Sequence, residues 1–483
     1  MKYILLLFAA TVTGTVFGQV KVSKGDISSG FTLTKQPVFN SYSTESDNYF
    51  VTVRREGFDK INNLIIADNN GKILLNKDIS INPGMMNNQY ELNRLLVLGN
   101  KTLVFVENHN KGELANTLTV RTLNARGEFD GKDALIGRMP IVKFSNPGSW
   151  AISLTPDKKH VAIIGINPYT KGVPTQVNYF ILDADLKETG KGNFNFASET
   201  KELRVFDFLA SDQNDLYIIS RDYDKTYLYP VIYKFTAGTE PSIIPVMIQE
   251  PDLKNLSYTY KVNQKGELVI AGYTQKKSTL QIDDVKAVGT WLFNSSNPAE
   301  VKTFNFDAPI TNLNANDIVF NGDTFYLVGE QYLKEKDMSN PSAFAMTEEN
   351  YNYTHGDIEV TGFSINGDKK FDVPINRFKR KVLNTDQALT FSSGIIDGKL
   401  ALIYNDQYGK YVDDERYRKD LMLPVATLIT NDGLMEAPAH FEKQLDVVVS
   451  TYLLYPQFFV PNQSKIFVLS ANKESVKIIT FNK

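Results

Sequence analysis

The amino-acid sequence predicts an all-β protein built from repeated four-stranded units. Aromatic residues make up 12% of the chain, with 24 Tyr and 30 Phe, and such residues favour strands over helices. A polar turn followed by a short apolar strand recurs along the whole chain. Apolar runs with helical spacing are short and few, so the strand pattern decides the fold class.

The first turn of each unit contains Asn, Asp or Gly, as in "LGNKTLVFV" and "FNGDTFYLVG". These residues tolerate left-handed backbone or bond their own chain, as tight turns require. The eight turns are centred near Asp47, Asn100, Asp157, Gln213, Lys265, Gly322, Gly398 and Asn462. Their spacing of about 52 to 76 residues indicates a repeat.

A second hairpin completes most units, as in "NNLIIADNNGKILL" and "VTGFSINGDKKFDV", whereas the last copy, "VKIITFNK", supplies one strand and stops at Lys483. Each unit is therefore a four-stranded antiparallel meander. Repeated around a ring, such meanders form a β-propeller. We expect eight blades, with seven as the alternative if the first or last unit is degenerate.

The last blade lacks one strand, and an N-terminal segment is expected to supply it. "SGFTLTKQPVF", Ser29 to Phe39, shows the alternation of a strand and precedes the first full repeat. We expect it to pair beside Val476 to Phe481 as the outer strand, which would close the ring.

One stretch resembles a known class. "WAISLTPDKKHVAIIG", Trp150 to Gly165, is similar to the strand, Pro-Asp turn and strand of the WD40-like and TolB-like propellers of exported bacterial proteins. The Trp-Asp dipeptide of true WD40 repeats is absent, and the present repeats are longer than the roughly 40 to 45 residues of that family. The resemblance implies a fold and no activity.

The N-terminus has the pattern of a secretory signal peptide. "MKYILLLFAATVTGTVFGQ" has one Lys, a short apolar run and small residues before Gln19, which predicts a signal over residues 1–18. A membrane anchor is the alternative, but the run is too short to span a bilayer. Since residue 19 is Gln and not Cys, no lipid anchor is indicated. We expect residues 19–483 to form one exported propeller domain without a transmembrane segment.

Composition excludes several function classes. Without Lys2, 51 basic residues stand against 55 acidic ones, a net charge of −4, so bulk charge does not draw the protein to nucleic acid. The chain has no cysteine, which excludes thiolate metal sites and cysteine nucleophiles.

Two long insertions are the candidate binding elements, Glu330 to Asp357 and Asn405 to Pro424. Long loops inside a compact fold are typically functional or disordered. Aromatic and basic side chains on a rigid scaffold suit a binding surface, although a solvated rim would also look like this. The candidate binding residues are Tyr332, Tyr351, Tyr353, Tyr408, Tyr411, Tyr417 and, in the basic crossover "NRFKRKVLN", Arg377, Lys379 and Arg380.

Reaction signatures are missing from the sequence. His109, His160, His355 and His440 lie in different repeats without zinc-ligand spacing, and no nucleophile elbow, phosphate loop or zinc-protease motif occurs. We expect no metal, no cofactor and no assigned catalytic residue. Loop carboxylates could support glycan cleavage, and these are Asp406, Asp413, Asp414 and Glu415 with Asp283 and Asp284.

The preferred hypothesis is a non-enzymatic interaction module of the cell envelope that binds a protein partner through its long-loop face. The Asn-, Lys- and Tyr-rich composition resembles exported proteins of the Bacteroidota. That resemblance implies a periplasmic protein and an outer-membrane partner, such as a subunit of the type 9 secretion complex. The alternative is a carbohydrate-binding or glycan-cleaving propeller that uses loop carboxylates and tyrosines.

Overall fold

The computed structural model of the chain consists of antiparallel β-sheets. It describes residues 21–29, 38–43, 48–54, 62–68, 72–81, 88–124, 126–142, 146–196, 205–223, 228–236, 239, 241–277, 285–336, 351–383, 391–411, 422–440, 453–462, 465–471 and 475–482. The predicted signal peptide and the middle of each insertion, residues 337–350 and 412–421, lie outside these residues.

The first four complete sheets follow chain order, each as an antiparallel meander. They comprise β2 (Val38–Ser43), β3 (Asn48–Arg54), β4 (Asn62–Asp68) and β5 (Ile73–Ile79); β6 (Asn88–Leu98), β7 (Lys101–Asn110), β8 (Ala115–Leu123) and β9 (Phe129–Pro140); β10 (Ser149–Leu154), β11 (His160–Ile166), β12 (Thr175–Asp183) and β13 (Glu188–Phe196); and β14 (Val205–Ala210), β15 (Leu216–Tyr223), β16 (Leu228–Phe235) and β17 (Ser242–Pro245).

The next sheets continue the pattern, and one of them has a fifth strand. They comprise β18 (Leu253–Val262), β19 (Leu268–Lys276), β20 (Lys286–Asn294) and β21 (Val301–Thr311); β22 (Leu313–Asn321), β23 (Thr324–Lys336), β24 (Tyr351–Ser364) and β25 (Lys369–Ile375) with β26 (Arg380–Leu383); β27 (Phe391–Ile396), β28 (Lys399–Gln407), β29 (Met422–Ile429) and β30 (Ala439–His440); and β31 (Leu453–Asn462), β32 (Lys465–Ala471) and β33 (Ser475–Asn482) with β1 (Lys21–Ser29). A 3-10 turn, η1 (Tyr408–Lys410), follows β28.

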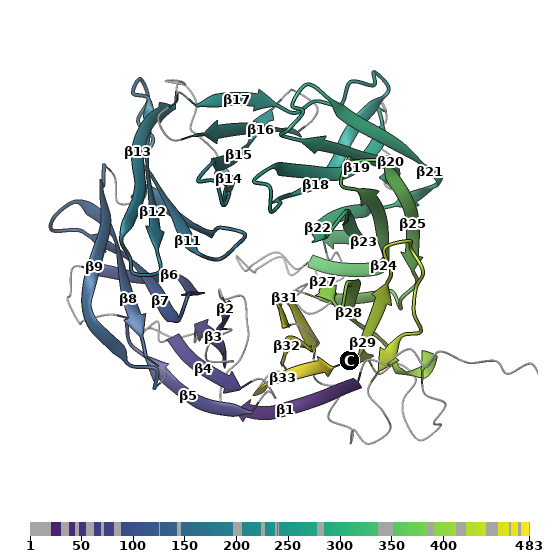
Figure 1. Cartoon of the computed structure of the whole chain (residues 1–483), viewed down its shortest axis with the longest axis horizontal. Coiled ribbons are helices and arrows are strands. Elements are labelled where there is room, and N and C mark those ends of the chain that lie inside the picture. The colour runs from purple at the N-terminus through teal and green to yellow at the C-terminus, as the bar shows by residue number, and fades with distance from the viewer. Residues whose placement is uncertain are drawn as a thin grey trace, which may run out of the picture.

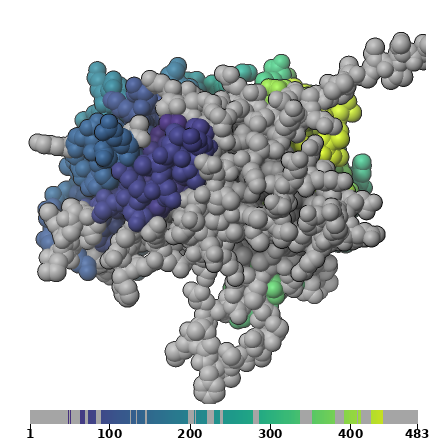
Figure 2. Space-filling model, turned by 90° about the horizontal axis from the view of Figure 1, so that it is seen from below, coloured from purple at the N-terminus to yellow at the C-terminus, as the bar shows by residue number. Residues whose placement is uncertain are grey.

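The sheets are arranged around a common centre, with the first strand of each meander innermost (Figure 1). Innermost strands of successive sheets contact one another in the order β2, β6, β10, β14, β18, β22, β27, β31, and β31 contacts β2. In the edge view of Figure 2, the purple and blue early part of the described chain and its yellow-green part near residue 430 lie on opposite sides. Antiparallel meanders set around a centre form a β-propeller, the predicted fold class.

The strand that pairs with β33 differs from the one expected. β1, residues Lys21–Ser29, runs antiparallel to β33, with Lys21 opposite Asn482 and Ser29 opposite Ser475 (Figure 1). Of the expected segment, Ser29 to Phe39, Ser29 is the one described residue that pairs there. The end of this segment starts β2, the first strand of the next sheet, and residues 30–37 lie outside the described residues.

The tight turns behave as their sequences predict. The turns near Gln213, Lys265, Gly322 and Gly398 each lie between two paired strands. The first three turns each contain one residue with positive φ, at Asn214, Gly266 and Gly322, and the fourth contains two, Asp397 and Gly398. Asn and Gly are the residues that adopt this backbone conformation at least cost, which explains why they mark the repeat.

Hydrophobic cores lie between neighbouring sheets. The core that joins sheet β14–β17 to sheet β18–β21 contains Ile232, Ile270, Trp291 and Phe293, all with at most 1% of their surface exposed. The next junction, between sheets β18–β21 and β22–β25, is built around Tyr273, Phe325 and Phe363. Strands buried on both faces therefore carry runs of apolar residues instead of strict alternation.

None of the helical segments in the described part of the chain is both long and apolar enough to cross a bilayer.

Candidate interaction site

The hairpin of β23 and β24 extends beyond the part that β25 covers. The two strands stay paired out to Lys336 opposite Tyr351, both within the first insertion. β26 pairs with the same end of β24, from Asn352 opposite Leu383 to His355 opposite Arg380. The base of this insertion is therefore a small three-stranded platform.

One face of the platform carries tyrosine and lysine. Because paired residues in an antiparallel sheet share a face, Tyr332, Lys334, Tyr351 and Tyr353 lie on the same side, and we call these four the tyrosine–lysine ladder. Lys334 Nζ lies 4.2 Å from the ring centroid of Tyr351 and 5.4 Å from that of Tyr353. These are cation–π contacts, which hold the ammonium over the rings while leaving its charge in place.

A buried ion pair lies below the ladder. Glu330, on β23, is 1% exposed and Arg377, in the crossover after β25, is 5% exposed. The Arg377 guanidinium bonds Glu330 Oε2, and its Nε donates to the carbonyl of Gly356. The Arg377 backbone N–H donates to Asp357 Oδ1 at 3.0 Å. Both the side chain and the backbone of Arg377 are thus held.

His355 connects the ion pair to the ladder. Its Nδ1 lies 3.1 Å from Glu330 Oε1, and only 4% of the residue is exposed. The imidazole meets the Tyr332 ring edge-on, with centroids 5.0 Å apart. Because His355 is paired with Tyr332 and shares its face, it packs beside the Tyr332 ring and fixes the orientation of that ring.

A second buried carboxylate holds the next residue of the crossover. Asp406, at the end of β28, is fully buried, and its Oδ1 accepts the backbone N–H of Phe378 at 2.7 Å. Its Oδ2 accepts from Lys410 Nζ at 3.0 Å and from Tyr411 Oη at 2.7 Å. Burial, with Tyr404 and Asp406 nearby, raises the pKa of Tyr411 far above its usual value. Tyr411 therefore stays a hydrogen-bond donor.

These contacts hold the crossover from both sides, and we call Glu330, His355, Arg377 and Asp406 the crossover clamp. Phe378 and Lys379, which follow Arg377, point outward, and 38% of Phe378 is exposed. A Cβ at Gly356 would stand 3.3 Å from Lys379 Cε, so the lysine stem lies close over this glycine. The clamp fixes an exposed aromatic residue and a cation next to the ladder.

The predicted binding residues are partly brought together. Tyr332, Tyr351 and Tyr353 share one face, and Lys379 is exposed beside them. Tyr408 begins η1 and Arg380 begins β26. Arg377 does not lie at the surface, because its side chain bonds Glu330. Tyr411 is partly buried on Asp406, and Tyr417 lies outside the described residues.

The carboxylates considered for glycan cleavage do not form a described site. Asp406 is buried and accepts four hydrogen bonds, including one from the Gln407 backbone N–H. The Asp406 carboxylate therefore has a structural role. The others, Asp283, Asp284, Asp413, Asp414 and Glu415, lie outside the described residues. Within the described part, no three His, Asp or Glu side chains gather as a metal site would require.

Sequence reasoning missed Glu330 and the structural role of His355. Glu330 begins the predicted insertion, and His355 lies within it. In the structure both lie within paired strands and are buried. The one available signal was that an isolated charge follows the apolar run "FYLVG" without a break.

Comparisons with known proteins place the chain in no family. No family model matches it, and no curated protein matches it. The β-propeller domain of the Trilobed protease from Pyrococcus furiosus has 8% identity and a TM-score of 0.38, over 85% of this chain and 96% of that one. The polysaccharide lyase Uly1 has 10% identity and a TM-score of 0.38, over 94% and 99%. The WD40 domain of SCAP from fission yeast has 8% identity and a TM-score of 0.37, over 96% and 94%. Similarity at this level carries no conclusion about activity.

Proposed function

We propose that the protein is a non-enzymatic interaction module that binds a protein partner through the loop face of sheets β22–β26 and β27–β30. The observation that carries this proposal is the crossover clamp, which holds Phe378 and Lys379 at the surface beside the tyrosine–lysine ladder. Burying charged groups costs several kcal/mol of desolvation for each ion and is weak evidence for stability. Here the buried charges order a surface that already carries aromatic residues.

The distribution of exposed apolar side chains supports the same face. Middle loops and crossovers lie on one side of the meanders and tight turns on the other. Among the described residues, five of the ten large exposed hydrophobic side chains lie in middle loops or crossovers, and these are Leu114, Val142, Val173, Met247 and Phe378. Leu114 has a φ of 47°, a conformation that costs a non-glycine residue about 1–2 kcal/mol. A strained and exposed leucine suits a binding surface.

In this proposal the module works in the cell envelope. The signal-like residues 1–18 support export, and we place the protein in the periplasm with an outer-membrane partner, as in a secretion complex. We also propose an eight-bladed ring closed by β1 beside β33. Each innermost strand contacts the innermost strand of the next sheet, and β31 contacts β2. This series of contacts supports closure.

The binding proposal is tested with a photo-crosslinking residue in place of Tyr353, in the full chain in its native envelope. We expect one crosslinked protein partner at this position and none with the same residue at Lys187, in a tight turn on the opposite face. Lys334→Glu should lower the recovered partner about tenfold, as for loss of a moderate hot spot. Lys187→Glu is the matched control and should leave recovery unchanged.

The binding proposal would be contradicted if the wild type were recovered from solubilised envelopes only as a free monomer. Equal recovery with Lys334→Glu and Lys187→Glu would contradict it as well. A crosslink to glycan instead of protein would favour the carbohydrate alternative.

Closure of the ring is tested by deleting residues 475–482. Because β33 pairs with both β1 and β32, its loss should lower the Tm of the main unfolding transition rather than add a small early step. A truncated protein that keeps the wild-type Tm would contradict closure.

A further inference from the structure

The junction between sheets β18–β21 and β22–β25 contains two buried polar groups that face each other. Tyr273, on β19, is fully buried and its Oη has no hydrogen-bond partner in the described part of the chain. This oxygen lies less than 3.0 Å from where a Cβ of residue 329 would stand. Gly329 therefore makes the notch that admits the Tyr273 hydroxyl between the sheets.

Glu359 lies at the side of this notch. The register places Glu359 directly opposite Gly329, and paired residues project to the same face with Cβ positions about 5 Å apart. Glu359 is 6% exposed. In the described part of the chain its carboxyl group has no hydrogen-bond or ion-pair partner, which is unusual for a buried carboxyl.

The surrounding charges do not favour an ionised Glu359. The groups that face it are Tyr273 from β19, Lys369 and Asp372 from β25, and Asp357 from its own strand. Lys369, the one cation among these groups, already bonds Asp372 and donates to the carbonyl of Asn305 at 2.9 Å. Asp357 and Asp372 repel a further negative charge. A neutral carboxyl is the form that suits this site.

We propose that a protonated Glu359, packed beside the Tyr273 hydroxyl, holds this junction, and that loss of its proton weakens the contact between the two sheets. A neutral carboxyl can share a hydrogen bond with Tyr273 Oη, whereas a carboxylate would be buried without a cation of its own. The junction is thus a proton-dependent contact between two sheets.

The electrostatics give the direction of the effect. Burial, together with Asp372, raises the pKa of Glu359 to about 8 from its ordinary 4.5. A carboxyl that binds its proton more tightly in the folded state makes folding less favourable as pH rises between these two values. Stability should fall up to about pH 8, and above that this group adds no further change.

The contact is coupled to the candidate site through β24. Glu359 and the ladder residues Tyr351 and Tyr353 lie on the same strand. Asp357, two residues from Glu359, accepts the backbone N–H of Arg377 in the crossover clamp. A weaker contact between the two sheets at Glu359 therefore affects β24, the strand that carries Tyr351 and Tyr353 of the ladder. The inference does not depend on the proposed binding function.

The test is the urea unfolding of the full chain between pH 6.5 and pH 9, for the wild type and Glu359→Gln. Linkage at this one site predicts that the unfolding constant of the wild type rises about 30-fold more than that of Glu359→Gln. Glu267→Gln is the matched control, since Glu267 accepts from Asn263 and Asn294, and it should keep the wild-type profile. Parallel profiles for the wild type and Glu359→Gln would overturn the proposal.

A direct measurement covers the case in which Glu359→Gln fails to fold. Infrared titration of the wild type should show a protonated carboxyl band that persists above pH 7 and disappears with a midpoint near pH 8. No band above pH 7 would overturn the proposal whatever the variant does.

Discussion

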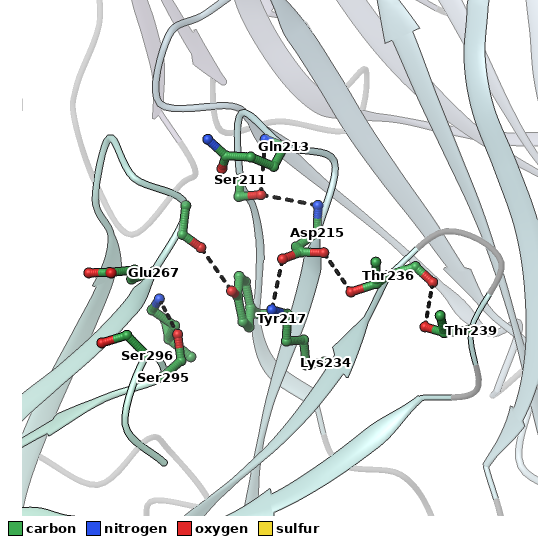
Figure 3. Close-up of polar contacts among 12 residues, drawn as sticks. Ser211, Gln213, Asp215, Tyr217, Lys234, Thr236, Thr239, Glu267, Ser295 and Ser296 are labelled. Atoms are coloured by element: carbon green, nitrogen blue, oxygen red, sulfur yellow. Dashed lines mark hydrogen bonds and ion pairs between the residues drawn. The ribbon is translucent and has the colours of Figure 1, made fainter.

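The tight-turn face and the loop face of the sheets arrange their polar groups differently. On the tight-turn face the same solution recurs from sheet to sheet. Ser211 Oγ accepts the backbone N–H groups two and four residues later, and Asn263 Oδ1 does the same in the next sheet. Tyr217 then donates to the Gly266 carbonyl at 2.8 Å and ties the two turns together (Figure 3).

Toward the loop face one other bond recurs, since Asn93 Nδ2 donates to Glu107 at 3.1 Å and Asn316 Nδ2 donates to Glu330 at 3.4 Å. In the described chain the pair of Glu330 and Arg377 occurs once, and its partners come from segments far apart in sequence. The turn bonds are local, and they build each sheet in the same way. The clamp serves one crossover only. This difference teaches that the recurring bonds specify the architecture, while the bond between Glu330 and Arg377, which occurs once in the described residues, orders one crossover.

The largest effect is expected from breaking the clamp. Arg377→Met removes the cation and leaves Glu330 buried beside apolar atoms, which should lower the free energy of unfolding by about 3–5 kcal/mol. Urea unfolding at neutral pH measures this. The double variant with Glu330→Gln should recover part of the loss, because no charge is then left buried. A loss below about 1 kcal/mol in Arg377→Met would show that the clamp is no more important than a turn bond.

A smaller effect is expected on the tight-turn face. Tyr217→Phe removes one hydrogen bond to the Gly266 carbonyl while keeping the buried ring, so the free energy of unfolding should fall by about 1 kcal/mol. Thermal unfolding of the purified chain measures it. A loss as large as that of Arg377→Met would erase the distinction between the two faces.

The control for this prediction is an exposed ion pair on the same face. Lys101 Nζ lies 2.8 Å from Asp185 Oδ1, and the Asp185 side chain is 83% exposed. Solvent screens such a pair, so Lys101→Ala should leave the Tm unchanged.

The sequence was sufficient to predict features that depend on residues close together along the chain, such as tight turns. Turns near Gln213, Lys265 and Gly322 could be located because Asn and Gly are needed at single positions with positive φ. The strand that pairs with β33 could not be located in the same way. Alternation marks a strand but not its partner, and "SGFTLTKQPVF" and Lys21–Ser29 both precede the first repeat.

The candidate site was predicted only in part for the same reason. Tyr332, Tyr351 and Tyr353 were found because aromatic residues beside long insertions are visible in the sequence. The burial of Arg377 was not, since its partner Glu330 is 47 residues away along the chain. Glu359 also left no signal, because its environment is made by Tyr273 from the neighbouring sheet.

The pairing of β1 with β33 sets a time at which folding can finish. Strands from opposite ends of the described chain share one sheet, so that sheet stays incomplete until residue 482 has been synthesised. Until then β1 and β32 each lack a neighbour, and unpaired strand edges attract other chains. The protein should therefore be most prone to aggregate just before β33 has been synthesised, when a chaperone would have the most to protect.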